Sequence, residues 1–130
     1  MSQESFAITN KTKGNLPTGR LPFQALKETV LGKNYALSLV FVTTKESQKL
    51  NKIYREKNKP TNILSFPLND QTGEIVICPT IAKQEAPKFD RSFENYLGFL
   101  FIHGLLHLKG FDHGSTMENE EQKIRTQFGI

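Results

Sequence analysis

The sequence has no tryptophan, one cysteine and three histidines among its 130 residues. A lone cysteine, Cys78, cannot form an intramolecular disulfide, which fits a protein of a reducing compartment. The most apolar run, residues 97–108, is too short to span a bilayer and includes two histidines. Residues 1–5 lack the basic start of a secretory signal. These absences argue against a disulfide-stabilised secreted domain and against a membrane protein, and we expect a cytoplasmic location.

Length and composition restrict the possible architectures more than the possible functions. A chain of 130 residues with 37% hydrophobic and 23% charged residues predicts one globular domain, over residues 1–130, with a single core. The formal net charge is +4 and the isoelectric point is about 9.2. An excess of positive charge favours a polyanionic partner such as RNA, although many domains without one are mildly basic.

All the histidines lie within residues 103–113. His103 and His107 are four residues apart, so on a helix they share one face, with Cβ atoms about 5–6 Å apart. Gly110 allows the chain to leave the helix, and the bend after it can return His113 to the other two. A single histidine on an apolar helix is usually a core residue, but three at ligand spacing favour one metal ion. The pattern predicts a His₃ zinc site with an open fourth position, as in catalytic zinc sites.

One residue inside this stretch restricts the chemistry. The spacing matches the zinc-protease pattern H-E-x-x-H-x-x-G-x-x-H, but Gly104 stands where that pattern has glutamate. The usual general base of a zinc peptidase is therefore missing, and peptidase activity is disfavoured.

Local patterns predict a mixture of strands and helices. Strands are expected at residues 6–10, 35–42, 63–67 and 74–78, with the last two forming an antiparallel hairpin. Helices are expected at residues 21–31, 44–57, 80–87, 92–108 and 115–128, with Thr43 or Thr44, Thr80 and Ser115 as N-terminal caps. The segment 92–108 is apolar nearly all round, which indicates a buried central helix that would hold the histidine pair rigidly.

The helix at 44–57 carries a second candidate site. Its basic residues fall on about one third of the circumference and are Lys45, Lys49, Lys52 and Arg55. The opposite side, with Leu50, Ile53 and Tyr54, is expected to face the sheet. The lysines are candidates for binding an RNA backbone, and a solvated charged face is the alternative. Arg55 is a candidate for a bidentate contact with phosphate.

Several motifs together resemble the YbeY family of bacterial rRNA-maturation endoribonucleases. Residues 103–113 match the family signature H-G-x-L-H-L-x-G-[YF]-D-H in full. Residues 60–67 are similar to its P-T-D-V-L-S-F-P, with Asn62 in place of Asp, and residues 73–77 are similar to its G-D-I strand, with Glu74 in place of Asp. The first 50 residues match only in overall pattern.

The resemblance implies a zincin-like α+β fold, with a mixed four-stranded sheet flanked by helices. It implies one zinc ion bound by His103, His107 and His113, and an important role for Arg55 in nuclease function. The expected activity is metal-dependent cleavage of single-stranded or structured rRNA during rRNA maturation and ribosome quality control. The expected partners are rRNA and the ribosomal small subunit, with no membrane and no DNA.

The group that transfers the proton is left open by the sequence. Asp112 and Glu74 are both candidates, and Asp112 can equally be a partner that orients a histidine. Two other functions stay open. One is a zinc hydrolase of a peptide or ester. The other is a ribosome-binding module without catalysis, whose structural zinc would have a fourth protein ligand.

Overall fold

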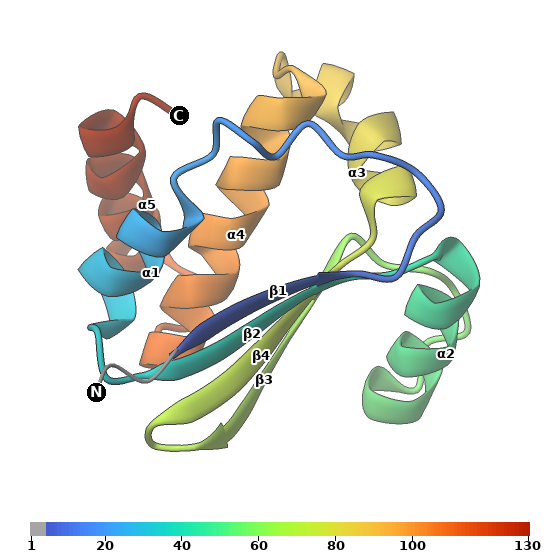
Figure 1. Ribbon diagram of the computed structural model, residues 1–130, viewed down its shortest axis with the longest axis horizontal. Helices are drawn as coiled ribbons and strands as arrows, with labels where there is room; N and C mark the ends of the chain where they lie inside the picture. Colours follow the sequence, from blue (N-terminus) through green and yellow to red (C-terminus); the bar gives the residue numbers. More distant parts are fainter. Residues whose placement is uncertain (1–4) are drawn as a thin grey trace.

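Strands and helices follow one another along the chain and form one mixed sheet with helices on both faces (Figure 1). The computed structural model describes residues 5–130, so the N-terminal segment used above to argue against a secretory signal lies almost entirely outside the described residues. The elements are β1 (Phe6–Asn10), α1 (Phe23–Leu31), β2 (Ala36–Phe41), α2 (Thr44–Arg55), β3 (Ile63–Asn69), β4 (Thr72–Ile77), α3 (Pro79–Glu85), the 3₁₀ helix η1 (Ala86–Phe89), α4 (Phe93–Lys109) and α5 (Ser115–Phe128). The predicted α+β architecture with a four-stranded mixed sheet is confirmed.

The strand order in the sheet is β1-β2-β4-β3. The first three of these pair in parallel, whereas β3 runs antiparallel to β4 and forms one edge of the sheet. The predicted hairpin is therefore confirmed, and its strands extend into residues 68–73, which the sequence had suggested were a loop.

Alternating side chains divide the sheet into two apolar faces. In β4, Ile75 and Ile77 belong to the main core with α1 and α4, whereas Val76 belongs to a smaller cluster with Leu50 of α2. Accordingly, α2 lies on one side of the sheet and α1, α4 and α5 lie on the other (Figure 1). Alternate residues of a strand therefore pack against α2 on one face of the sheet or against α1 and α4 on the other.

Helix α4 is the buried central helix that its composition predicted. Leu97, Phe101, Ile102 and Leu105 have no accessible surface, and α4 packs against α1, α3, α5 and the β3–β4 hairpin. The helix begins after Ser92, whose hydroxyl accepts a hydrogen bond from the amide of Asn95 at 3.1 Å. It ends at Gly110, whose φ of 111° is accessible to glycine at little cost.

Of the other predicted N-terminal caps, only the one of α2 is confirmed. The Thr43 hydroxyl accepts a hydrogen bond from the Glu46 amide at 3.2 Å, as expected for α2. The predictions for Thr80 and Ser115 are wrong. Helix α3 starts earlier because Pro79 takes its first position, where a missing N–H costs nothing, and α5 starts at Ser115 itself after Gly114.

The expected inner face of α2 is also partly wrong. Leu50 packs against the sheet, and the Tyr54 ring contacts that of Phe66 in β3 with centroids 4.8 Å apart, although Tyr54 is 62% exposed. Ile53 is 60% exposed. The buried side chains of α2 are instead the small polar Ser47 and Asn51, which hydrogen-bond the carbonyl oxygens of Thr61 and Lys59. The helix is thus fixed to the following loop through hydrogen bonds, with only a narrow apolar contact to the sheet.

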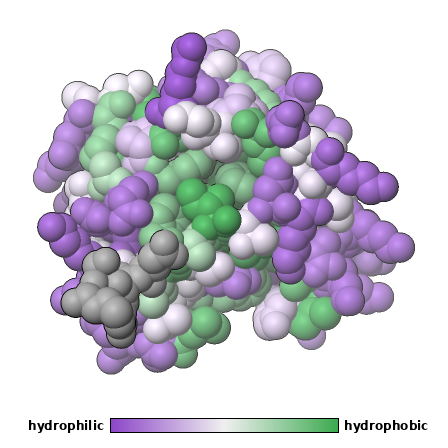
Figure 2. Space-filling model, in the orientation of Figure 1, coloured by the Kyte–Doolittle hydropathy of each residue, from purple (hydrophilic) through white to green (hydrophobic). Residues whose placement is uncertain are grey.

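No helix within residues 5–130 has the length and apolar character needed to cross a membrane. Hydrophilic side chains predominate over the α2 end of the molecule, and hydrophobic ones gather near the centre of the face in view (Figure 2).

Candidate metal centre and adjoining pockets

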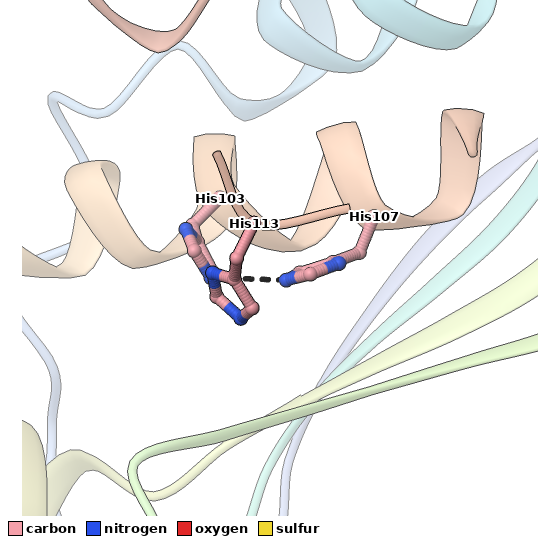
Figure 3. Close-up of side chains that lie close together, drawn as sticks. All are labelled: His103, His107 and His113. Carbon is pink, nitrogen blue, oxygen red and sulfur yellow. Dashed lines mark hydrogen bonds between the residues drawn. The ribbon is translucent and has the colours of Figure 1, made fainter. Parts of the chain in front are cut away.

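The three histidines converge at one end of α4 (Figure 3). His103 and His107 come from the helix, and His113 comes from the loop that follows Gly110. The Nε2 atoms of His103 and His107 lie 3.1 Å apart, and one nitrogen from each of the three rings lies within 4.8 Å of the others. The predicted juxtaposition is therefore present in the structure.

The other nitrogens of the helical pair are engaged elsewhere. His103 Nδ1 lies 2.5 Å from Oε1 of Glu121 on α5, and His107 Nδ1 donates to the Phe111 carbonyl oxygen at 3.1 Å. These contacts fix the ring orientations and leave both Nε2 atoms directed at one point. Histidine ligands of metal sites typically use the second ring nitrogen in this way. The donor set fits a transition-metal ion such as zinc.

The surroundings of His107 favour its unprotonated form. Burial lowers the pKa of His107, and the neighbouring His103 and His113 lower it further, against smaller opposing effects of the Phe111 carbonyl and Glu121. A metal ion binds only the neutral ring, so this shift reduces competition from protons.

Gly104 lies against the sheet, beside the first histidine. A Cβ atom there would be 3.0 Å from Ile63 Cδ1, 3.1 Å from Ile75 Cδ1 and 3.1 Å from Ser65 Oγ. Those distances are tighter than normal contacts, so even alanine would require the neighbours to move. Glycine at this position thus allows α4 to approach the β3–β4 hairpin closely.

Arg55 shares a pocket with the histidines. A pocket of about 430 Å³ lies between α4 and the edge strand β3, and its walls comprise Arg55, Asn62, Ile63, Ser65, Pro67, His103, His107 and His113. Arg55 is the last residue of α2, so it reaches this pocket although α2 covers the opposite face of the sheet. The pocket combines three possible metal ligands with a guanidinium group and contains no carboxylate.

Asn62 is held by a small polar network at the rim. Its amide nitrogen donates to Glu85 Oε1 at 2.9 Å, and the Tyr96 hydroxyl donates to the same oxygen at 3.0 Å. Burial, followed by the Glu85 hydrogen bond, raises the pKa of Tyr96 to about 12, so the phenol keeps its proton at neutral pH. Aspartate at position 62 would set a second carboxylate beside Glu85. The amide avoids that repulsion.

The remaining candidates are not brought to the histidines. In β4, Glu74 is on the opposite face of the sheet from Ile75 and on the same face as Val76, which is the face that α2 covers. Asp112 is exposed and is not among the lining residues of the two pockets beside the histidines. The exposed lysines Lys45, Lys49 and Lys52 line a separate hollow along α2.

Glu121 is a site residue that the sequence interpretation missed. It is 9% exposed and lies on the inner face of α5 with Met117 and Ile124, which are both buried. The spacing of these three residues contained the signal. An acidic residue at a core position of an amphipathic helix needs a polar partner inside the protein.

Comparison with known proteins agrees with this architecture. The family model described as "Endoribonuclease YbeY" matches residues 4–129. The proteins named Endoribonuclease YbeY from Colwellia psychrerythraea and Staphylococcus carnosus are each 38% identical to this chain. Their alignments cover 92% and 75% of this chain, and 88% and 71% of the respective relatives.

The solution structure of TM1509 from Thermotoga maritima is similar, with a TM-score of 0.66 and 30% identity over 95% of this chain and 89% of that one. The match of the family model spans nearly every described residue, including all three histidines and Arg55. The resemblance inferred from the motifs is thereby confirmed: the chain belongs to the YbeY family of endoribonucleases.

Proposed function

We propose that this endoribonuclease cleaves single-stranded regions of rRNA during rRNA maturation and ribosome quality control, using a zinc ion bound by His103, His107 and His113. The proposal includes a zincin-like arrangement of the metal helix, the ribosomal small subunit as partner and a cytoplasmic location. The observation that carries it is the single pocket shared by the histidines and Arg55.

The three histidines would hold the metal, and Glu121 and the Phe111 carbonyl would orient the two helical rings. When bound, the ion supplies Lewis-acid charge at the phosphoryl group and activates water. None of the residues that line the Arg55 pocket carries a carboxylate, which leaves room there for an anionic phosphate.

Arg55 would bind the phosphodiester at the site of cleavage. A guanidinium can donate two parallel hydrogen bonds to phosphate oxygens and stabilise charge that develops on them. Its exposed position at the end of α2 leaves its side chain accessible to RNA. The catalytic role of Asp112 stays a prediction, since its carboxylate is exposed in the loop before His113.

Peptide hydrolysis is the weaker alternative. Gly104 offers no carboxylate, and its close approach to Ile63 and Ile75 excludes a longer side chain at that position. A purely structural zinc would need a fourth protein ligand, and within residues 5–130 the ligand cluster comprises the three histidines alone.

Two variants test the proposal together. His107→Ala should lose most of its bound metal, because two ligands rarely retain the ion, and should lose RNA cleavage with it. Arg55→Lys should keep the metal and the fold but cut at least about tenfold more slowly, because an ammonium cannot reproduce the bidentate contact.

Elemental analysis and cleavage of an rRNA fragment measure the two properties on the same samples. Stoichiometric metal in His107→Ala would refute the metal site. Cleavage by Arg55→Lys at the wild-type rate would remove Arg55 from the mechanism. Peptide hydrolysis that depends on His103 would overturn the substrate class.

A further inference from the structure

A second cavity, of about 280 Å³, opens beside the histidines on the side of α5 and η1. It shares Asn62, Ile63, His103 and His113 with the pocket that contains Arg55, so the two cavities adjoin one another at the histidines.

The wall of this second cavity is built from stacked aromatic rings. Phe89 and Tyr96 are nearly parallel, with an interplanar angle of 16° and ring centroids 5.3 Å apart. Tyr96 and Phe99 are also nearly parallel, at 5.8 Å and 10°, and Phe89 and Phe99 lie 6.4 Å apart at 26°, so the three rings form a triangular cluster. Phe89, the last residue of η1, is 54% exposed, whereas Tyr96 is buried. The exposed part of the Phe89 ring can take one further planar group.

The charges around the two cavities differ in sign. The Arg55 pocket has a cation and no carboxylate, whereas the aromatic cavity includes Glu118 and Glu121 among its lining residues. A phosphate would be repelled by these carboxylates, but a neutral heterocycle with amino groups would not. The guanidinium carbon of Arg91 lies over the Phe99 ring, 4.5 Å from its centroid, and this contact helps to hold the ring in place.

We propose that the aromatic cavity is a nucleobase subsite, in which the base of the nucleotide adjoining the cleaved phosphodiester stacks on Phe89. The inference rests on the proposed function, since it places one further nucleotide of the same RNA substrate. Protein aromatics bind bases of single-stranded nucleic acid by stacking, with little dependence on sequence. The phosphate lies toward Arg55 and the histidines, and the base lies toward Phe89.

The test uses short oligoribonucleotides that carry 2-aminopurine, whose fluorescence is quenched by stacking, at successive positions around the cleaved bond. Binding to the metal-loaded protein is read in stopped-flow mixing, before cleavage. We expect quenching at one position beside the cleaved bond. We expect binding to weaken by roughly five- to thirtyfold in Phe89→Ala, the lower part of the range for loss of one base–aromatic stack.

Matched variants separate stacking from general apolar contact. Phe89→Leu should behave like Phe89→Ala, and Phe89→Tyr should behave like the wild type. Leu68→Ala should change nothing, because Leu68 is similarly exposed at 66% but lines neither cavity. An oligonucleotide with an abasic site at the quenched position should bind equally weakly to the wild type and Phe89→Ala. Thermal unfolding checks that each variant is folded.

Wild-type binding and quenching in both Phe89→Ala and Phe89→Leu would overturn the subsite, as would an abasic probe that binds the wild type undiminished. Because binding is read separately from cleavage, the two proposals can fail separately. Quenching that depends on Phe89, without metal-dependent cleavage, would support the subsite and refute the proposed function. Metal-dependent cleavage that is indifferent to Phe89 would do the reverse.

Discussion

The two helical layers of this protein position their functional candidates by different means. On one face, α4 is anchored in the packed core and presents the half-buried His103 and His107 to a pocket, and Glu121 fixes one ring from the neighbouring helix. On the other face, α2 carries Lys45, Lys49 and Lys52 on an exposed surface with a narrow apolar contact to the sheet. Both layers were suggested by residue spacing along a helix, but only one has its side chains fixed by neighbours.

This difference matters because the two kinds of chemistry tolerate different errors. A metal centre requires its ligands within tenths of an ångström, so it depends on packing. Attraction of an RNA backbone acts over roughly 8–10 Å at physiological salt and does not require fixed side chains. Arg55 connects the two regions, because it is the last residue of the exposed helix α2 and also lines the pocket of the histidines.

The largest expected effect concerns the packed side. Gly104→Ala should lower the free energy of unfolding by about 1–3 kcal/mol, because its Cβ would overlap the 3.0–3.1 Å contacts with Ile63, Ile75 and Ser65. Gly104→Glu should cost more and leave little folded protein, since it also buries a charge among apolar groups. Chemical denaturation measures both.

A charge introduced on the exposed side provides the control. Ile53→Glu on α2 should change stability by no more than about 0.5 kcal/mol, because Ile53 is 60% exposed. Equal destabilisation by Gly104→Ala and Ile53→Glu would mean that the two layers do not differ in packing as described.

The second prediction sharpens the comparison within the metal centre. Glu121→Gln keeps the size of the side chain but removes the charge facing His103 Nδ1, so zinc affinity should fall by about 10–100-fold. Titration against a competing chelator measures this. Glu120→Gln, one residue earlier on the same helix, changes a partly exposed carboxylate that pairs with Lys123 at 3.9 Å, and this variant should bind zinc as the wild type does. Unchanged affinity in Glu121→Gln would show that this carboxylate does not support the ligand.

The sequence predicted those features that depend on local pattern. The histidine spacing, the break at Gly110 and the apolar character of residues 92–108 each point to a rigid His₃ cluster, and the structure brings the three rings together. The hairpin followed in the same way from two short apolar runs and the turn residues between them, whereas the mixed sheet was implied by the family resemblance.

The features that were missed depend on contacts between elements. No local pattern fixes which face of the sheet α2 covers, and Ile53 was misassigned because its side chain is 60% exposed, whereas Leu50 and Tyr54 contact the sheet. Glu121 was missed because its partner lies 18 residues away along the chain. The exclusion of Glu74 likewise needs the register of β4 against its neighbours, which places it on the α2 face with Val76.

The smallest effect is expected on the exposed side, where replacing Lys45, Lys49 and Lys52 with glutamine should weaken RNA binding without changing metal content or stability. Phosphate contacts release counterions, and each contributes about 0.7 to the slope of log affinity against log salt for single-stranded nucleic acid. The triple variant should therefore flatten that slope by up to about two, the full value requiring that all three lysines contact phosphate.

How far the salt slope flattens in the triple variant depends on the path that the RNA takes over the protein surface. The lysines line a hollow on the α2 side, whereas the histidine pocket lies at the β3 edge. Arg55, the last residue of α2, lines the histidine pocket, so we expect a strand that reaches both to pass it. A matched variant with Lys11, Lys33 and Lys123 replaced by glutamine loses the same net charge from exposed positions elsewhere. A larger change in slope for the α2 variant than for this control would place the RNA backbone along α2. Equal changes would mean that the lysines act only through net charge, and that specific contact with the RNA begins at Arg55.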